Sequence, residues 1–500
     1  MKVETTKNYQ NFKGFNLSPL SKGLYTLSNN DMLNAAAVDL FATDTQRTVI
    51  ETKRRGKNAG IEMGFREFTG TFIVEFSATL FALLASKLVS KKYKPDVKIN
   101  SNSWLTNNAI DTFSEIYQKS DKTLSGFIDD TLNSLSGLSG NNVKKFSDVA
   151  QEKAKPIKDT LIDIIQNSSK MTSKAKKTAM TNLQDDIIKV LKADNSVTLT
   201  SGTKKFSDNL THVLRDTVDA AQNVFFKDGV NPKTVTDKLK TLNKSRVAIA
   251  IPLSLALAIS NQKLNRTLTK KRTGIDNFVG ENGYENNVKN QNQTKKEKGL
   301  WAKKILSAGV FLTMLMATMG IKKPIDLVKN LEFNGPATSG NTIKTIYGTL
   351  ITGRILAAKD STELRETNLR DYLGFLNWLV LGGFVAKGVG QALDPKKTQL
   401  FNIAKEGKGI KHWLKNVELK SQKEIIAQGG NIKKNLIKLN IAQISGIAYS
   451  AIMLGILLPR LNIALTQSKK PKENPDEKKV ITKSNLFEAT TPKIFKEFMV

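Results

Sequence analysis

The residues that most often perform chemistry in proteins are scarce in this sequence. Cysteine is absent, and only two histidines occur among the 500 residues. His212 and His412 lie far apart, and neither stands at a metal-ligand spacing from a second ligand. A phosphate-binding loop of the Gly-x-x-x-x-Gly-Lys-Ser/Thr type is also absent. We therefore expect no enzyme activity, no bound metal and no cofactor.

One pattern of charged residues occurs twice, each time at the start of an apolar segment. Arg66–Gly70 and Arg370–Gly374 both read Arg–acid–aromatic–x–Gly. Arginine and an acid at the headgroup boundary, an aromatic anchor and a glycine that admits a neighbouring helix explain the pattern structurally. The alternative is a substrate site at the four charged residues. The candidate helix-interface or membrane-boundary residues are Arg66, Glu67, Gly70, Glu75, Arg370, Asp371 and Gly374.

Glu75 is the carboxylate that lies inside an apolar segment instead of among the charged residues that flank it. A charged side chain within a membrane is expensive unless it has a partner, so such a residue is a functional candidate. Because Glu75 follows the start of its segment by about one helical turn, we expect it at the membrane interface. Arg354, in a weaker apolar segment, is its candidate partner.

Five apolar segments must position these residues, and they are the strongest signal in the chain. They cover 71–89, 247–260, 305–321, 372–393 and 441–458, and a weaker sixth covers 343–358. Lysine and arginine flank them on both sides, as expected for residues at the headgroup level. A span needs about 20 apolar residues, so the short segment 247–260 suits a buried or interfacial helix equally well. We predict an all-α, multi-pass helical membrane protein with about five spans, four to six being compatible. A large soluble helical bundle is the alternative.

A second recurring pattern predicts an internal duplication. Residues 263–269 and 460–466 share the order base–Leu–Asn–x–x–Leu–Thr, and each follows an apolar segment. Together with the Arg–acid pattern, two matches in the same order favour a tandem duplication with halves near 31–272 and 343–472. Transporters are often built from two such repeats.

Residues 100–245 are polar and carry helical periodicity without a long apolar run. Apolar stripes over 157–165, 183–191 and 206–225 predict four to six amphipathic helices in an extramembrane domain. The sequence Lys-Lys-Phe-Ser-Asp occurs at 144–148 and again at 204–208. We interpret both copies as helix starts, with Ser147 and Ser207 as N-caps. This domain is the candidate surface for a protein partner.

The composition divides the chain into six regions. They are a polar N-terminal region at 1–65, a first membrane helix with a basic flank at 66–99, the extramembrane helical domain at 100–245, the second and third membrane helices with a basic loop at 246–342, a second repeat half at 343–466, and a charged, partly disordered tail at 467–500.

The net charge of the chain indicates which class of partner it binds. Lys and Arg number 77 against 45 Asp and Glu, which gives a net charge of +32. Aromatic residues make up only 7% and do not alternate with the basic ones, so nucleic acid is an unlikely partner. Anionic lipid headgroups fit the lysine-rich flanks. We therefore expect a non-enzymatic scaffold or interaction protein integral to an anionic membrane. A two-repeat transporter or channel and a peripheral polyanion- or lipid-binding helical protein are the alternatives.

Overall fold

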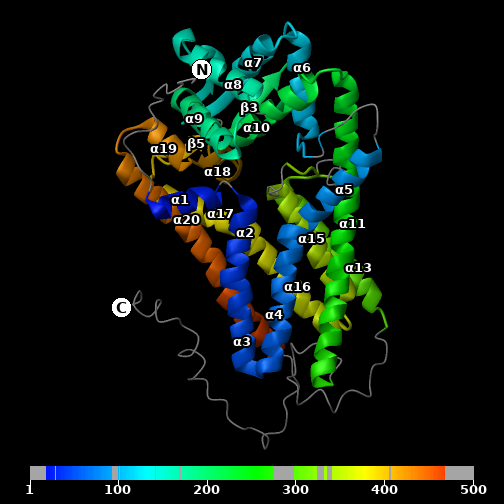
Figure 1. Cartoon of the computed structure of the whole chain (residues 1–500). Helices are drawn as coiled ribbons and strands as arrows, with labels where there is room; N and C mark the ends of the chain where they lie inside the picture. The colour runs from blue at the N-terminus through cyan, green and yellow to red at the C-terminus, as the bar shows by residue number, and fades with distance from the viewer. Residues whose placement is uncertain are drawn as a thin grey trace, which may run out of the picture.

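The computed structural model describes residues 18–28, 30–92, 100, 102–140, 142–167, 170–274, 298–323, 331–334, 340–404 and 407–467. It is mostly helical, with 77% helix and 6% strand, as the sequence predicts. The charged tail predicted at 467–500 lies outside the described residues apart from Gln467. Figure 1 shows two parts, a bundle of long helices and a smaller domain at one end of it.

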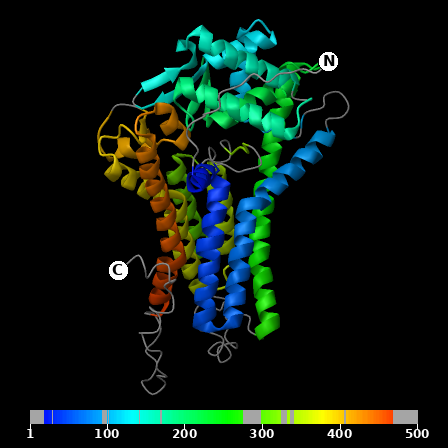
Figure 2. The ribbon, with the colours of Figure 1, turned by 60° about the vertical axis from the view of Figure 1, so that its left-hand side comes forward.

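The bundle is built from long helices, several of which contain a π-helical turn (η). Its elements are α1 (Pro19–Ser28), α2 (Asp31–Val38), η1 (Asp39–Asp44), α3 (Thr45–Arg55), α4 (Lys57–Phe72), η2 (Ile73–Ser77), α5 (Ala78–Lys92), α11 (Pro232–Thr273), α13 (Leu300–Met319), α15 (Gly340–Ala357), α16 (Ser361–Leu376), η5 (Asn377–Leu381), α17 (Gly382–Leu393), α20 (Ile432–Ile452), η6 (Met453–Leu457) and α21 (Leu458–Gln467). Figure 2 shows these helices running side by side away from the smaller domain.

Five of the helical stretches are long and apolar enough to cross a bilayer. They are Lys57–Ser90, Pro232–Thr273, Leu300–Met319, Glu363–Leu393 and Ile432–Leu465. Four of them contain one of the apolar segments of the sequence in full, and Leu300–Met319 contains all of segment 305–321 except its last two residues. The weaker sixth segment forms α15, which lies inside the bundle, with Ile343, Ile346 and Ile351 almost completely buried. The short second segment is the middle of α11, which continues through Pro252 for 42 residues.

The N-terminal region is a structural part of the bundle. Residues 31–55 run as one continuous helix through α2, η1 and α3. Gly56, with φ of 87°, ends this helix and lets the chain turn back into α4. The helical hairpin packs tightly because Gly60 and Gly64 of α4 face Thr52 and Thr48 of α3. A stretch of sequence that reads as polar therefore supplies one of the inner helices.

The smaller domain, residues 102–245, contains a β-sheet as well as helices. Its elements are α6 (Asn107–Lys119), α7 (Leu124–Asn133), β1 (Leu135–Ser139), β2 (Asn142–Lys145), the 3-10 turn η3 (Phe146–Asp148), α8 (Gln151–Asn167), α9 (Ser173–Leu191), β3 (Val197–Ser201), β4 (Lys204–Asp208), α10 (Leu210–Ala220) and η4 (Ala221–Phe225). The strands form one antiparallel sheet in the order β2-β1-β3-β4. Phe113, Phe127 and Leu199 are among the fully buried residues of its own core.

Neither copy of the repeated Lys-Lys-Phe-Ser-Asp sequence starts an α-helix, which corrects our interpretation of both copies as helix starts. The second copy is strand β4 in full, and Phe206 is a buried strand residue instead of part of a helical stripe. Asn209 caps α10 by accepting a hydrogen bond from the His212 N–H, so Ser207 is not a cap. The first copy ends strand β2 and forms η3, so Ser147 lies four residues before α8 begins. Short alternating strands with one buried aromatic residue resemble one turn of an amphipathic helix in sequence, which is the source of the error.

A third, small unit between α17 and α20 connects the domain to the bundle. It comprises β5 (Phe401–Ile403), α18 (Ile410–Asn416), β6 (Val417–Leu419) and α19 (Gln422–Gln428). The Ile403 N–H donates to the Gly140 carbonyl across the boundary. The buried Glu424 carboxylate accepts the backbone N–H groups of Asp194 and Ser421 at 2.8 and 2.7 Å. These contacts fix the smaller domain over one end of the bundle.

Candidate functional site

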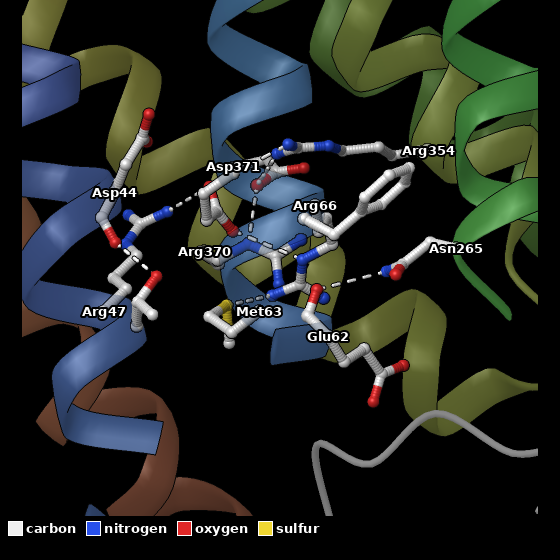
Figure 3. A network of polar contacts seen from close by, with 12 residues as sticks. Asp44, Arg47, Glu62, Met63, Arg66, Asn265, Arg354, Arg370 and Asp371 are labelled. Atoms are coloured by element: carbon white, nitrogen blue, oxygen red, sulfur yellow. Dashed lines mark hydrogen bonds and ion pairs between the residues drawn. The ribbon is translucent and has the colours of Figure 1, made fainter. Parts of the chain in front are cut away.

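A network of buried arginines and carboxylates lies inside the bundle (Figure 3). In its first half, Glu67 of α4 accepts a hydrogen bond from Arg47 of α3 at 3.1 Å and another from Arg66 at 3.2 Å. All three side chains are at most 7% exposed. Arg47 also donates to the backbone carbonyl of Leu454 in η6, which ties the hairpin to the last long helix.

The second half of the network also consists of one carboxylate and two arginines. Asp371 of α16 accepts from Arg370 at 2.8 Å and from Arg354 of α15 at 3.2 Å. Arg354 also lies 3.9 Å from Glu67, so it joins the two halves. The four charged residues of the recurring sequence pattern therefore meet in one network. They lie at helix interfaces within the bundle, where each is at most 7% exposed.

The glycines of the recurring pattern lie next to residues of α15. A β-carbon at Gly70 would lie 2.6 Å from a terminal nitrogen of Arg354, so a larger residue there would make this arginine shift. A β-carbon at Gly374 would lie 3.8 Å from the Tyr347 hydroxyl, an ordinary van der Waals contact. Both copies of the pattern thus lie beside α15, and only Gly70 is in close contact with it.

The two helices that carry the pattern share a further feature. The π-turn η2 begins at Ile73 and η5 begins at Asn377, each seven residues after the arginine of its pattern, and each contains five residues. A π-turn widens a helix by one residue and is frequent at functional sites. Equal offsets in both helices agree with the predicted duplication, which remains a prediction.

Carboxylates form a second group beside the network. Thr71 Oγ1 lies 2.8 Å from Asp44 Oδ2 and 3.5 Å from Asp39 Oδ2. Glu75, one turn further along the same helix, is 1% exposed. Both of its carboxylate oxygens are buried without a hydrogen-bond partner among the described residues. One expectation is corrected: Arg354 pairs with Asp371 and Glu67 instead of with Glu75. Glu75 lies in the middle of the helical stretch Lys57–Ser90, and its position at a membrane interface stays a prediction.

A cavity of about 470 Å³, which we call the domain-side cavity, opens where the bundle meets the smaller domain. Its charged lining residues are Lys344, Lys387 and Lys420, and no described lining residue is a carboxylate. Trp378 and Gly382 form part of the wall, and Gly383, where a β-carbon would meet no atom within 4 Å, leaves the space open. A cavity with this lining attracts anions.

A second, smaller cavity of about 40 Å³ lies on the other side of the network. We call it the arginine cavity, because its lining includes Arg47, Arg54, Arg66 and Arg370 together with the two carboxylates Glu51 and Glu366. It has room for about one water-sized particle or a small ion.

Three continuous helices line both cavities. The helix α2–η1–α3 contributes residues 34–38 to the domain-side cavity and residues 47–54 to the arginine cavity. In the helix α16–η5–α17, residues 378–387 line the first cavity and Glu366 and Arg370 line the second. The helix α20–η6–α21 lines the domain-side cavity with residues 443–450 and the arginine cavity with residues 459–463. In each helix a π-turn separates, or directly borders, the two lining stretches.

Other candidates for chemistry do not assemble into a site. His212 pairs with Asp208 at 2.9 Å on the surface of the smaller domain, and His412 lies in the short helix α18. Among the residues that the structure describes, no group of three or more His, Cys, Asp or Glu side chains could hold a metal ion.

Sequence reasoning missed the contribution of α2, η1 and α3. Asp39, Asp44 and Arg47 lie in a region without an apolar run, although all three are buried. The available signal was the four-residue spacing of Asp39, Thr43, Arg47 and Glu51, which places them on one helical face. A polar face of this kind normally faces water, so its burial could not be anticipated.

No family model matches the chain, and comparisons with curated proteins and with solved structures give no match. The chemistry of the site therefore rests on its geometry.

Proposed function

We propose that the chain is an integral membrane protein whose bundle spans the bilayer and forms a path for a small anion between the domain-side cavity and the arginine cavity. This is the two-repeat transporter or channel that the sequence offered as an alternative. The observation that carries it is the placement of two cationic cavities at opposite ends of the same three helices, with a buried ion-pair network between them.

The distribution of polarity over the bundle supports insertion in a membrane. Phe68, Phe72, Phe76, Leu80, Leu84 and Leu88 follow one another at four-residue spacing along α4, η2 and α5, and each is 40–54% exposed. Arg66, Glu67 and Glu75 of the same helix face inward, whereas Lys87 near its end is exposed. Exposed apolar stripes of this length mark contact with lipid or with another protein. Apolar side chains outside and paired charges inside are the arrangement that a bilayer favours.

The charges along the path support selection of an anion. Three lysines line the domain-side cavity, and four arginines with two carboxylates line the arginine cavity. Three of these arginines, Arg47, Arg66 and Arg370, also belong to the network, where they and Arg354 pair with Glu67 and Asp371. The carboxylates Asp39 and Asp44 lie beside the network, so the excess of basic residues is at the two cavities. Excess positive charge in a low-dielectric enclosure raises the local concentration of anions. The small volume of the arginine cavity favours an ion as small as chloride or nitrate over a larger organic acid.

Reconstitution of the full chain in liposomes tests this function. We expect chloride or nitrate to cross protein-containing membranes faster than protein-free ones. Gly383→Trp should block most of this flux, because Gly383 lines the domain-side cavity and a side chain there meets no neighbouring atom within 4 Å. The matched control is Gly388→Trp, five residues further along α17, where a side chain is equally unobstructed but lies outside the cavity lining.

The selectivity of the flux gives a second readout. Lys387→Glu replaces one of the three lysines by a carboxylate and should shift the permeability ratio from anions toward cations. If chloride flux is absent, or if Gly383→Trp and Gly388→Trp transport equally well, the path proposal is wrong.

The scaffold function predicted from the sequence stays as a second proposal, and one feature of the smaller domain favours it. A groove between α8 and α9 is lined by four carboxylates, at Glu152, Asp159, Asp163 and Asp186, against the two lysines Lys155 and Lys174. An acidic groove on a chain of net charge +32 suits a basic peptide of a partner protein. A photo-reactive amino acid at Thr178 in the groove should then crosslink a partner in intact membranes, whereas one at the exposed Lys205 outside it should not.

A further inference from the structure

We propose that Glu75 and Asp39 form a proton-binding site inside the bundle, and that proton binding there is coupled to anion movement along the path. The coupling rests on the proposed function, whereas the proton site stands on the observations that follow.

The first observation is the isolation of Glu75. Its carboxylate is buried at 1% exposure, and neither oxygen has a hydrogen-bond partner among the described residues. An ionised carboxylate removed from water and left without a partner is strongly disfavoured. Binding a proton removes the charge and is the least costly way to keep this side chain in place.

The second observation is the neighbouring acid. Thr71 precedes Glu75 by one turn on the same helix, and its hydroxyl lies 3.5 Å from the Asp39 carboxylate. Asp39 is also the charged group that acts electrostatically on Glu75. Two carboxylates in one poorly solvated place do not both ionise readily, so such a pair tends to share one proton.

The remaining neighbours leave Glu75 without a positive partner. The π-turn η2 packs against α2, α11 and α15. From α11 the hydroxyl of Ser254 contacts Ser77, which is uncharged. From α15, Tyr347 and Arg354 act on Asp39, and Arg354 is already bonded to Asp371.

The other charged groups around Asp39 belong to the network. Asp44 shares Thr71 with it, and Arg47 is bonded to Glu67. The described residues near Glu75 also offer no cluster of ligands for a metal ion, and a hard cation needs about six oxygen ligands. A proton is therefore the occupant that the geometry fits.

The proposal includes the passage of a proton between the domain-side cavity and the site. Val38, the residue before Asp39, lines the domain-side cavity. On the other side Thr71 connects Asp39 to Asp44, which is followed along the helix by Arg47. A proton from cavity water adds to a carboxylate oxygen to form an O–H bond, and its release reverses the step without any redox partner.

Carbodiimide labelling of the full chain in liposomes tests the site independently of transport. Dicyclohexylcarbodiimide dissolves in membranes and adds to protonated carboxyl groups, so the peptide containing Glu75 should carry the adduct. Labelling should fall about tenfold for each pH unit once the carboxyl is mostly ionised. Glu152, an exposed carboxylate of the smaller domain, is the matched control and should stay unlabelled at neutral pH. Absence of label at Glu75 and Asp39 in the folded protein would overturn the proton site.

Flux measurements test the coupling. An inward proton gradient should speed chloride uptake by the unaltered chain several-fold, and Glu75→Gln should transport at one rate with and without the gradient. Glu75→Asp keeps a titratable group and should retain the response, which separates loss of the proton from loss of fold. If Glu75 is labelled but no anion flux is measured, the path proposal is wrong and the proton-site proposal stands. If the flux of the unaltered chain is the same with and without the proton gradient, the proposed coupling is wrong.

Discussion

At the scale of single residues, the molecule depends on charges that are buried and paired. Glu67 is the most connected of these, because it accepts from Arg47 and Arg66 and lies near Arg354. Removing one member of a buried pair leaves its partners as uncompensated charges, which costs far more than losing a surface pair.

We therefore expect Glu67→Ala to destabilise the bundle by about 3–5 kcal/mol. Thermal unfolding of the detergent-purified chain would measure the change. Glu115→Ala is the control, because Glu115 pairs with Lys119 on an exposed helical face of the smaller domain, where a pair contributes about 0.3–0.5 kcal/mol. Equal effects of the two substitutions would mean that the network does not hold the bundle together.

Asp216 of the smaller domain gives a pH-dependent prediction. Burial raises the pKa of its carboxyl group from 3.8 to about 6, although Arg215 donates two hydrogen bonds to it. Because folding raises this pKa, the contribution to stability is complete below about pH 4. It is lost as the pH rises through 6, when the buried group must ionise.

Asp216→Asn should make the domain less sensitive to pH, since the amide oxygen can still accept from Arg215. Hydrogen exchange of the α10 amides, compared between the variant and the unaltered chain at each pH, would measure this. We expect equal protection near pH 4 and better protection in the variant near pH 8. Better protection in the unaltered chain at pH 8 would contradict the assignment.

At the scale of elements, the close approach of α17 and α20 shapes the domain-side cavity. A β-carbon at Gly446 would lie 2.6 Å from the Gly382 carbonyl oxygen, and one at Gly382 would lie 2.4 Å from the Ser450 hydroxyl. The two helices therefore touch through backbone, and the cavity lies beside this contact.

Gly446→Val should force these helices apart, destabilise the bundle by about 3 kcal/mol and alter anion flux. The melting temperature and the flux would both be measured. Gly383→Val lies in the same cavity wall without a neighbouring atom within 4 Å, so it should leave the melting temperature nearly unchanged. If Gly446→Val melts like the unaltered chain, the helices do not pack as described.

Viewed as a whole, the bundle buries several charged side chains within its apolar core and exposes large apolar side chains on its outer surface. Arg66 and Arg246 are among the largest fully buried side chains, whereas Trp301, Ile305 and Leu306 are 55–69% exposed on α13. In water, the exposed apolar side chains would lose the favourable free energy of burial, and the buried charges would add an unfavourable free energy of desolvation. In a bilayer, apolar side chains are favoured on the outer surface and charged ones inside, so both contributions favour the observed fold.

We expect the chain to stay in the membrane fraction after a high-salt wash and after alkaline carbonate, and to need detergent for release. The measurement is immunodetection of the chain in the pellet and the supernatant after each wash. Residues 102–245 should become accessible to protease from one side only, because the smaller domain lies at one end of the bundle (Figure 1). Release by salt alone would mean that the exposed apolar stripes cover a protein partner instead of lipid.

Elements that depend on local composition could be predicted from the amino-acid sequence. Apolar runs such as 305–321 and 441–458 are predicted to be helical because they are uncharged and lack the turn residues that separate short strands. The structure has long helices at both places. The sequence also brought Arg66, Glu67, Arg370 and Asp371 to notice, because a repeated spacing is visible without coordinates. Short strands such as β4 escaped, since five residues cannot distinguish a strand from one helical turn.

The charges that pair with one another are visible only in the folded chain. Arg47 and Leu454 are 407 residues apart along the chain, and Arg354, which lies beside Gly70, reaches both Glu67 and Asp371. Periodicity describes one helix at a time and shows neither its neighbours nor whether a polar face is turned toward water or toward the interior. The burial of Asp39 and Glu75, and the two cavities on either side of the network, follow from packing among helices that no local pattern encodes.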